Sequence, residues 1–301
     1  MAEYHLAVGK PWEQQAAGSG KGTRATLVLT CARSVGAEEN AAVPGAVAVE
    51  LVHGFSLLHD DIMDRDRLRR HQPSAWVEFG VPAALLTGDA LLAQALRVLG
   101  ESGSHRAVSV LVDALDGLMR GQSMDMAFEQ RADVTLVEYR SMAEGKTGAL
   151  LGAACALGAV LGGAQEPVVS ALRRFGQHAG IAFQCADDIL GLWGDPRLTG
   201  KPVGRDLTCG KKTYPLLAAL AAEGPAGDRV RHLYACSGGC STKRVEELLE
   251  AIKDAGGRAA AEREAAAQVH NALRHLDSAR LSEPARRELE SLTYGLADRC
   301  R

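Results

Sequence analysis

Three aspartates near residue 60 carry the clearest chemistry in this sequence. Asp60 and Asp61 follow His59, and Asp64 comes three residues later. On a helix, Asp60 and Asp64 lie one turn apart on the same face, with Asp61 beside them. No cationic side chain stands among the three, so their charges repel one another, and Mg²⁺ prefers carboxylate oxygens. The segment therefore predicts a divalent metal site at the end of an apolar helix.

Arginines follow the acids directly. Arg67, Arg69 and Arg70 have guanidinium groups suited to bidentate contact with phosphate oxygens. Acids followed by arginines at the end of a buried helix indicate a metal-bridged polyphosphate ligand.

The same order of charges recurs further along the chain. A second apolar helix ends in Asp187 and Asp188, and cationic segments around Lys201 and Lys211 follow it. One such motif is weak evidence, but two with the same order are strong. We expect the two acidic helices to face each other across a cavity and to hold a cluster of Mg²⁺ ions between them.

Helical periodicity covers nearly the whole chain, and no alternating β-branched runs call for a sheet. Gly and Pro breakers, among them Pro44-Gly45 and Gly145 to Gly148, separate the apolar segments. The sequence predicts an all-α fold, a single bundle of ten or more helices around a central cavity. Residues 1–301 are expected to form one domain, with residues 1–20 poorly ordered. Helices are expected over 26–32, 46–58, 82–99, 107–127, 137–161 with a break, 167–192, 214–222, 243–255, 258–276 and 284–298.

Composition excludes several classes of function. Hydrophobic residues make up 47% of the 301 residues and charged residues 24%, which fits a soluble protein with a sizeable core. The net charge of −3 gives no reason to expect nucleic acid as a partner. No run of eighteen apolar residues and no basic-then-apolar leader is present, so we expect no transmembrane segment and a cytoplasmic location. Seven scattered cysteines favour reduced thiols.

These motifs resemble those of the trans-polyprenyl diphosphate synthases, the all-α enzymes that elongate isoprenoid chains. The resemblance runs from about residue 18 to the C-terminus and includes Gly88-Asp89, Gly121-Gln122 and Asp125. It implies an isoprenoid synthase fold and head-to-tail condensation of isopentenyl diphosphate with an allylic diphosphate. The expected cofactor is Mg²⁺, with three ions, and the expected assembly is a homodimer.

The resemblance also assigns roles to individual residues. It places the metal ions on Asp60, Asp61, Asp64, Asp187 and Asp188, with Asp61 and Asp188 in direct contact or one shell removed. It gives the allylic diphosphate to Arg69, Lys146, Lys201 and Lys211, and isopentenyl diphosphate to Lys21, Arg24, His53 and Arg70. Thr147 and Gln184 are expected to present dipoles to the allylic cation.

Three positions depart from the family pattern. Ala25 stands where the basic loop usually has proline, and His71 replaces the usual glycine after the arginine pair. Gly191 stands where many relatives carry a third acid, so we expect the third metal site to be retained but weaker.

Product length is expected to depend on Phe55 and the small residue Ser56. Phe55 precedes Asp60 by five residues, about 7.5 Å along a helix axis. An aromatic residue there, with no insertion in the aspartate motif, resembles the family members that make C20 products. The sequence therefore favours geranylgeranyl diphosphate, with farnesyl diphosphate next.

Other classes of protein share parts of this pattern. A terpene cyclase is also helical and aspartate-rich, but it needs no grip on a second diphosphate and favours aromatic pockets, whereas aromatic residues are only 4% here. A metal phosphohydrolase would need further histidine ligands that we cannot place. A non-catalytic subunit of a heteromeric synthase would be expected to lose acids that this chain retains.

Overall fold

A computed structural model describes residues 1–6, 22–69, 72–195, 203–235 and 242–297. These residues are almost entirely helical, which confirms the all-α prediction. They form two compact units. The first unit comprises Met1–Leu115, Leu150–Arg174 and Leu276–Leu289, and the second comprises Asp116–Ala149, Phe175–His275 and Glu290–Arg301. A single domain over residues 1–301 stays a prediction.

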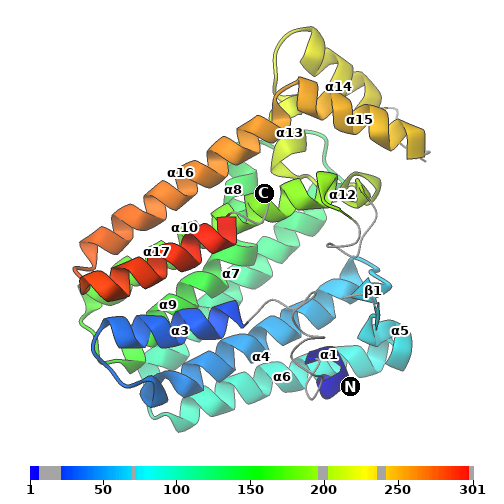
Figure 1. Cartoon of the computed structure of the whole chain (residues 1–301). Helices are drawn as coiled ribbons and strands as arrows, with labels where there is room; N and C mark the ends of the chain where they lie inside the picture. The colour runs from blue at the N-terminus through cyan, green and yellow to red at the C-terminus, as the bar shows by residue number, and fades with distance from the viewer. Residues whose placement is uncertain (7–21, 70–71, 196–202, 236–241, 298–301) are drawn as a thin grey trace. The chain divides into compact units, whose positions relative to one another are not determined.

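The first unit is built on α4 (Glu39–Met63), which packs against α3 (Thr23–Ser34) and α6 (Val81–Glu101) (Figure 1). The sequence predicted a break at Pro44-Gly45, but α4 continues through both residues. A Cβ at Gly45 would lie 2.8 Å from Leu161 Cδ1, so the glycine lets α4 approach its neighbour closely. This packing outweighs the single backbone hydrogen bond that a proline removes.

A short hairpin follows α4 and is the only sheet in the described residues. β1 (Leu68–Arg69) pairs antiparallel with β2 (Gln72–Pro73), and α5 (Ala75–Phe79) comes next. The sequence predicted no sheet, because strands of two residues are too short to show an alternating pattern. The hairpin places Arg69 beside the end of α4.

The N-terminal residues form a short helix that the sequence did not predict, α1 (Ala2–Leu6). His5 is buried, with its Nε2 atom 3.1 Å from the Gly54 carbonyl oxygen in α4. The Tyr4 hydroxyl donates a 2.8 Å hydrogen bond to the Pro73 carbonyl. These contacts connect α1 to both α4 and the hairpin.

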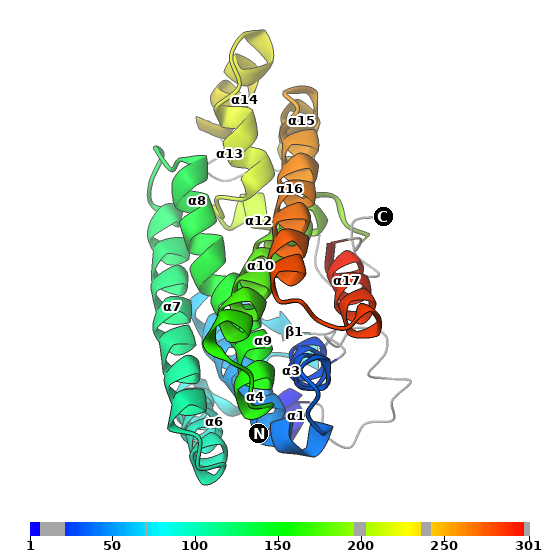
Figure 2. The same cartoon turned by 90° about the vertical axis from the view of Figure 1, so that its left-hand side faces the viewer.

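The second unit contains α8, η1 and α12 to α15. Their bounds are Leu136–Ala143 for α8, Glu144–Gly148 for the π-helix η1, Arg205–Thr208 for α12, Tyr214–Leu220 for α13, Pro225–Ala235 for α14 and Thr242–Asp254 for α15. The predicted break near Gly145 is the π-helix. The helices α13, α14 and α15 lie close together (Figure 2). They pack around an apolar cluster that includes Leu216, Val230 and Leu248.

Five further helices complete the part of the chain that the structure describes. They are α7 (His105–Glu129), α9 (Ala149–Leu161), α10 (Glu166–Trp193), α16 (Gly257–Ser278) and α17 (Glu283–Ala297). Each was predicted within a few residues of its observed bounds, because helices of this length show clear periodicity. In contrast, α5, α12 and α14 were not predicted.

Two described helices, α4 and α6, are long and apolar enough to cross a membrane by length and composition. Within their most apolar windows, 50% of the residues of α4 and 28% of those of α6 are buried inside the structure. The core helix of a soluble protein passes the same test, so the two helices are weak evidence for a membrane span.

Candidate active site

The first acidic cluster lies where α4 ends. The Asp64 amide donates a 2.8 Å hydrogen bond to the Asp60 carbonyl, so the two aspartates are one turn apart, as predicted. Both side chains are partly exposed, and the positive φ of 54° at Arg65 ends the helical conformation. Two carboxylates that stand one above the other at a helix end suit a hard divalent cation.

Asp61 differs from its two neighbours because it is only 1% exposed. Arg69 Nε donates to both of its oxygens at 2.8 Å, and Arg69 Nη2 lies 2.6 Å from Oδ1. The hairpin therefore holds Arg69 against Asp61. In this arrangement each residue fixes the other at the edge of the acidic cluster.

The hairpin itself is fixed by aromatic and backbone contacts. Trp76 Nε1 donates a 2.8 Å hydrogen bond to the Asp66 carbonyl, and the Arg67 guanidinium lies 5.9 Å from the centre of the Trp76 ring. The Ser74 amide donates to the Arg67 carbonyl at 2.9 Å. The segment after the aspartates is thus held in place by contacts with Trp76 of α5.

The residues predicted to set the product length, Phe55 and Ser56, precede the aspartates on α4. Phe55 is 6% exposed, and its ring meets the His59 ring edge-on at a centroid distance of 4.7 Å. The His59 ring fits against α6 at Gly88, where a Cβ would come within 2.3 Å of Nε2. The Ser56 hydroxyl donates to the His53 carbonyl at 2.9 Å. The Gly88 landmark therefore has a packing reason: it makes room for His59, which supports Phe55.

Two of the residues predicted to bind isopentenyl diphosphate are described. Arg24 lies in the first turn of α3 and His53 on α4, and both are partly buried. The Ala25 amide donates a 3.0 Å hydrogen bond to Glu50 Oε1, so a carboxylate of α4 caps this helix start. Lys21, Arg70 and Lys201, together with the unusual His71, lie outside the described residues.

The second cluster is built around the π-helix η1, which carries Lys146 and Thr147. Glycines bring it close to both neighbouring helices. A Cβ at Gly121 of α7 would lie 2.1 Å from the Lys146 backbone nitrogen, and one at Gly180 of α10 would lie 2.6 Å from the Gly148 Cα. Side chains at these positions would push the helices apart. A π-helical turn inside a longer helix often marks a functional site.

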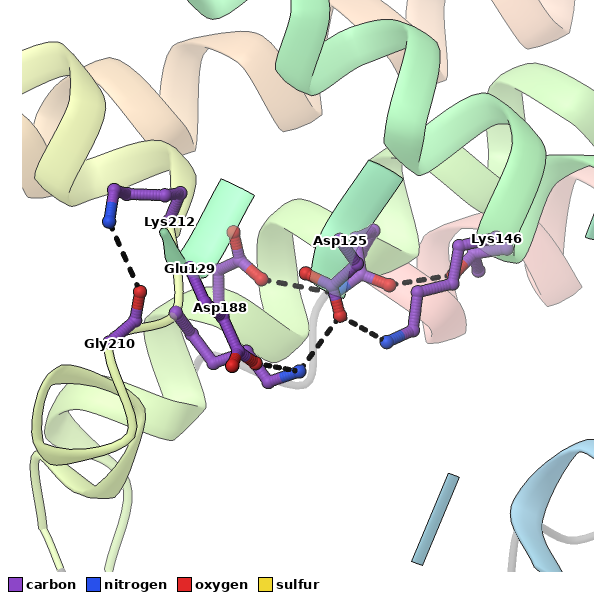
Figure 3. Close-up of polar contacts among 9 residues, drawn as sticks. Asp125, Glu129, Lys146, Asp188, Gly210 and Lys212 are labelled. Carbon is purple, nitrogen blue, oxygen red and sulfur yellow. Dashed lines mark hydrogen bonds and ion pairs between the residues drawn. The ribbon is translucent and has the colours of Figure 1, made fainter. Parts of the chain in front are cut away.

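Asp125 forms salt bridges with two lysines, Lys146 and Lys211. The Lys146 ammonium lies 2.6 Å from Asp125 Oδ2, and the Lys211 ammonium lies 2.9 Å from the same atom and 3.1 Å from Glu129 Oε1. Figure 3 shows Lys146 and Asp125 directed at each other. Burial alone would raise the pKa of Asp125, but the two ammonium groups outweigh it and hold the pKa below its ordinary value. The result is a pair of ordered cations around one carboxylate.

Thr147 and Gln184, both predicted site residues, are joined by a hydrogen bond. The Thr147 hydroxyl donates to Gln184 Oε1 at 2.6 Å, and Gln184 Nε2 donates to Asp188 Oδ1 at 3.0 Å. The proton of Thr147 is thus directed to Gln184, and the lone pairs of its oxygen face elsewhere. The chain of hydrogen bonds to Asp188 therefore fixes the orientation of the Thr147 hydroxyl and of the Gln184 amide.

Asp188 accepts two further hydrogen bonds on Oδ2, from the Tyr139 hydroxyl at 2.6 Å and from the Tyr214 amide at 2.7 Å. Burial raises the pKa of Asp188 to about 7, against the opposing effect of these hydrogen bonds. Its neighbour Asp187 is only partly buried. The two acids of the second motif therefore differ in the same way as Asp60 and Asp61 in the first.

Gly191, the position that departs from the family pattern, lies against a carboxylate from another segment. A Cβ at Gly191 would be 2.0 Å from Asp206 Oδ2. Asp206 belongs to the short helix α12 and lies close enough to Asp188 to act on its charge. The place of a side chain at 191 is thus taken by an acid from elsewhere in the chain.

Several residues of this site were missed from the sequence. Tyr139, Tyr214 and Asp206 contact the second motif or its surroundings, and Glu129 contacts Lys211. Glu129 follows Asp125 by one helical turn, a spacing that could have indicated a shared partner. The other three come from separate segments, and no local pattern in the sequence connects them to Asp188.

The chain is similar to known proteins over most of its length. The polyprenyl synthetase family matches residues 7–252 of this chain. A (2E,6E)-farnesyl diphosphate synthase of Mycobacterium bovis is 43% identical, over 99% of this chain and 85% of that protein. A geranylgeranyl diphosphate synthase of Mycobacterium tuberculosis is also 43% identical, over 93% of this chain and 81% of that protein.

A solved structure shows the same fold. The crystal structure of a geranylgeranyl pyrophosphate synthase from Corynebacterium glutamicum, complexed with isoprenyl diphosphate and magnesium, superposes with a TM-score of 0.84. Its identity to this chain is 27%, and the superposition covers 99% of this chain and 90% of that one. The chain therefore belongs to the polyprenyl synthetase family and is a prenyltransferase of the short-chain trans-prenyl diphosphate synthases.

Proposed function

We propose that the protein condenses isopentenyl diphosphate head-to-tail with an allylic diphosphate in a Mg²⁺-dependent reaction. The observation that carries this proposal is the pair of ammonium groups, Lys146 and Lys211, held around Asp125. Two ordered cations of this kind suit a diphosphate, whose charge grows as it leaves the allylic carbon. In the reaction the allylic C–O bond breaks, a C–C bond forms to isopentenyl diphosphate, and a proton is lost.

The carboxylates fit the magnesium ions that the family implies. Across the described residues, no three His, Cys, Asp or Glu side chains gather closely enough to hold a metal by themselves. Mg²⁺ is usually bound through one or two carboxylates, with waters and substrate phosphates completing its shell, so its site does not require three such side chains. Asp60, Asp64 and Asp187 would bind the ions, three in number, which would supply charge neutralisation for the departing diphosphate.

Asp61 and Asp188 were expected to touch the metal directly or through one shell. We propose the indirect role for both, since Arg69 contacts both oxygens of Asp61 and three hydrogen bonds cover Asp188. A carboxylate that already accepts bonds on both oxygens has little capacity left for a cation.

A buried amide supports a ligand near Asp125. Gln122 lies one turn before Asp125 on α7 and is 6% exposed, and neither of its side-chain polar atoms has a hydrogen-bond partner among the described residues. A buried amide without partners costs free energy, so a water or a substrate group is expected to bond to it.

The remaining residues divide between the substrates. Arg69 and the two lysines grip the allylic diphosphate together with Lys201, while Arg24 and His53 hold isopentenyl diphosphate together with Lys21 and Arg70. The Thr147 oxygen, whose proton is directed to Gln184, presents its lone pairs to the allylic cation. The released diphosphate takes the proton.

We propose a C20 product, geranylgeranyl diphosphate, with Phe55 as the barrier to a longer chain. Farnesyl diphosphate is the alternative. Sequence identity does not distinguish the two products, because a relative named for each of them is 43% identical to this chain. The argument for C20 rests on the buried Phe55 ring, which His59 supports, and on the small Ser56 beside it.

We expect a homodimer and a cytoplasmic location. Val81, Leu85 and Leu86 of α6 are 37%, 40% and 70% exposed, an apolar face that a second copy of the chain would cover. Sedimentation of the wild-type protein and of Leu86→Glu tests this expectation. A wild-type monomer would contradict it.

The first experiment is product analysis with isopentenyl diphosphate and dimethylallyl, geranyl or farnesyl diphosphate, with Mg²⁺ and with a chelator. A Mg²⁺-dependent linear product supports the condensation, and a C20 length supports Phe55 as the barrier. Cyclised hydrocarbon from a single diphosphate would instead indicate a terpene cyclase. Absence of turnover with every primer would indicate a non-catalytic subunit.

A further inference from the structure

The loop from Gly210 to Tyr214, called here the lysine loop, is held at three points. Lys211 contacts Asp125 and Glu129 of α7, and the Tyr214 amide contacts Asp188 of α10. The third point is Lys212, which no part of the proposed reaction uses. The loop thus sets the position of Lys211 and one hydrogen bond of Asp188 together.

Lys212 is a buried cation, with 5% of its surface exposed. Its ammonium donates to the Tyr234 hydroxyl at 2.9 Å and to the Gly210 carbonyl at 3.3 Å, and it lies 5.4 Å from the centre of the Tyr234 ring. In the part of the chain that the structure describes, no carboxylate forms a salt bridge with it. Figure 3 shows its side chain directed toward Gly210 and away from Asp125.

A buried ammonium is costly unless its donors are bonded. Lys212 meets this demand with a tyrosine hydroxyl and a backbone carbonyl, and both hydrogen bonds are lost if the side chain moves away. Tyr234 cannot follow easily, because it belongs to α14 and packs against the apolar cluster of α13, α14 and α15. Lys212 is therefore bonded to a side chain that packs against this apolar cluster.

Lys211 and Lys212 are neighbours on this loop, and their ammonium groups contact different helices. Lys212 contacts Tyr234 of α14, whereas Lys211 contacts Asp125 of α7. We propose that Tyr234 and Lys212 are positioning residues that hold Lys211 in place for the allylic diphosphate. This inference rests on the proposed function, and it gives α14 a role in binding the allylic substrate.

The test is Tyr234→Phe, which removes the hydroxyl that accepts from Lys212 and keeps the aromatic ring in the apolar cluster. We expect KM for geranyl diphosphate to rise about tenfold, the equivalent of one hydrogen bond to a charged group, with KM for isopentenyl diphosphate within about twofold of the wild type. Tyr294→Phe is the matched control, because Tyr294 is 49% exposed on α17. It should leave both KM values unchanged.

A second measurement separates positioning from general loss of structure. Calorimetric titration with inorganic diphosphate in a chelator reports on the cationic side chains without the metal, and Tyr234→Phe should weaken this binding by a similar factor. Lys212→Met should weaken it at least as much, while Lys212→Arg, which keeps a charged donor, should restore part of it. Equal rises in both KM values, or unchanged diphosphate binding by both Tyr234→Phe and Lys212→Met, would overturn the inference. If the wild-type protein elongates none of dimethylallyl, geranyl and farnesyl diphosphate, the proposed function fails instead.

Discussion

Arg69 holds the Asp61 carboxylate from the side: its Nε lies 2.8 Å from each oxygen and its Nη2 lies 2.6 Å from Oδ1. Asp60 and Asp64, on the same helix, are partly exposed. Consecutive aspartates of one motif therefore have different surroundings, and we expect different consequences when each is changed.

Asp61→Asn should act mainly on stability. It leaves a largely buried guanidinium without its carboxylate, which typically costs about 3 kcal/mol of unfolding free energy. Asp60→Asn should instead leave stability nearly unchanged and abolish the Mg²⁺ response. Urea unfolding and Mg²⁺ titration of product formation measure the two effects, with Asp254→Asn, an exposed position on α15, as control. A stable Asp61→Asn protein that has lost its Mg²⁺ response would make Asp61 a direct ligand.

The carboxyl of Asp125 should stabilise the protein in a pH-dependent way. Burial opposes ionisation, but Lys146 and Lys211 hold its pKa below the ordinary value. The folded pKa lies below the unfolded value of about 3.9, so the stabilisation is complete at higher pH and disappears as pH falls through the folded value.

Asp125→Asn should therefore lower the unfolding free energy by about 2–4 kcal/mol at pH 7, because two ammonium groups lose their shared partner. The difference from the wild type should shrink once the pH drops below about 4. Urea unfolding at pH 7, 4 and 3 measures it. A difference that stays constant over this range would show that the charge of Asp125 does not carry the effect.

The Thr147 hydroxyl should matter for turnover and little for folding. Thr147→Val keeps the shape and removes the oxygen that we propose faces the allylic cation, so we expect kcat to fall about tenfold to a hundredfold with KM nearly unchanged. Thr147→Ser retains the hydroxyl and should keep most of the activity. Steady-state kinetics with geranyl diphosphate decide the matter, and equal kcat for the valine and serine variants would remove Thr147 from the reaction.

The sequence predicted the long helices and the two acidic motifs because their signals are local. Asp60 and Asp64 repeat at one helical turn, and apolar spacing identifies α10 before Asp187 is reached. The hairpin and α1 were not predicted, because each is too short to show a periodic pattern. The contact of His5 with Gly54 joins residues far apart in the sequence, so no local pattern indicates it. Likewise, the difference between Asp187 and Asp188 arises from Tyr139 and Tyr214, which only folding brings together.

A side chain at position 191 is expected to displace the Asp206 carboxylate. Even an alanine Cβ would lie 2.0 Å from Asp206 Oδ2, so that carboxylate must move. Gly191→Asp, which adds the third acid that the resemblance implies, should therefore lower the unfolding free energy by about 1–3 kcal/mol, because Asp206 must move and the two carboxylates repel each other.

A double-mutant cycle tests the cause of this loss. Adding Asp206→Ala to Gly191→Asp should recover stability if the two carboxylates compete for one place. Gly295→Ala is the matched control, since no atom lies within 4 Å of its Cβ position, and it should be neutral or slightly stabilising. Additive effects of the two changes would mean that Asp206 does not restrict position 191.

Phe55 should set the length of the product. Its ring is buried on α4 and rests edge-on against His59, which is itself seated on Gly88. Phe55→Ala removes most of this volume in a region where a long apolar chain is the proposed ligand, so we expect products longer than C20. Because the substitution also costs about 3–5 kcal/mol of packing, activity is compared at a temperature where the variant is folded. Phe55→Leu, which keeps much of the volume, should give mostly wild-type lengths. Chromatography of the dephosphorylated products measures the distribution, and an unchanged distribution in a folded Phe55→Ala enzyme would place the barrier at another residue.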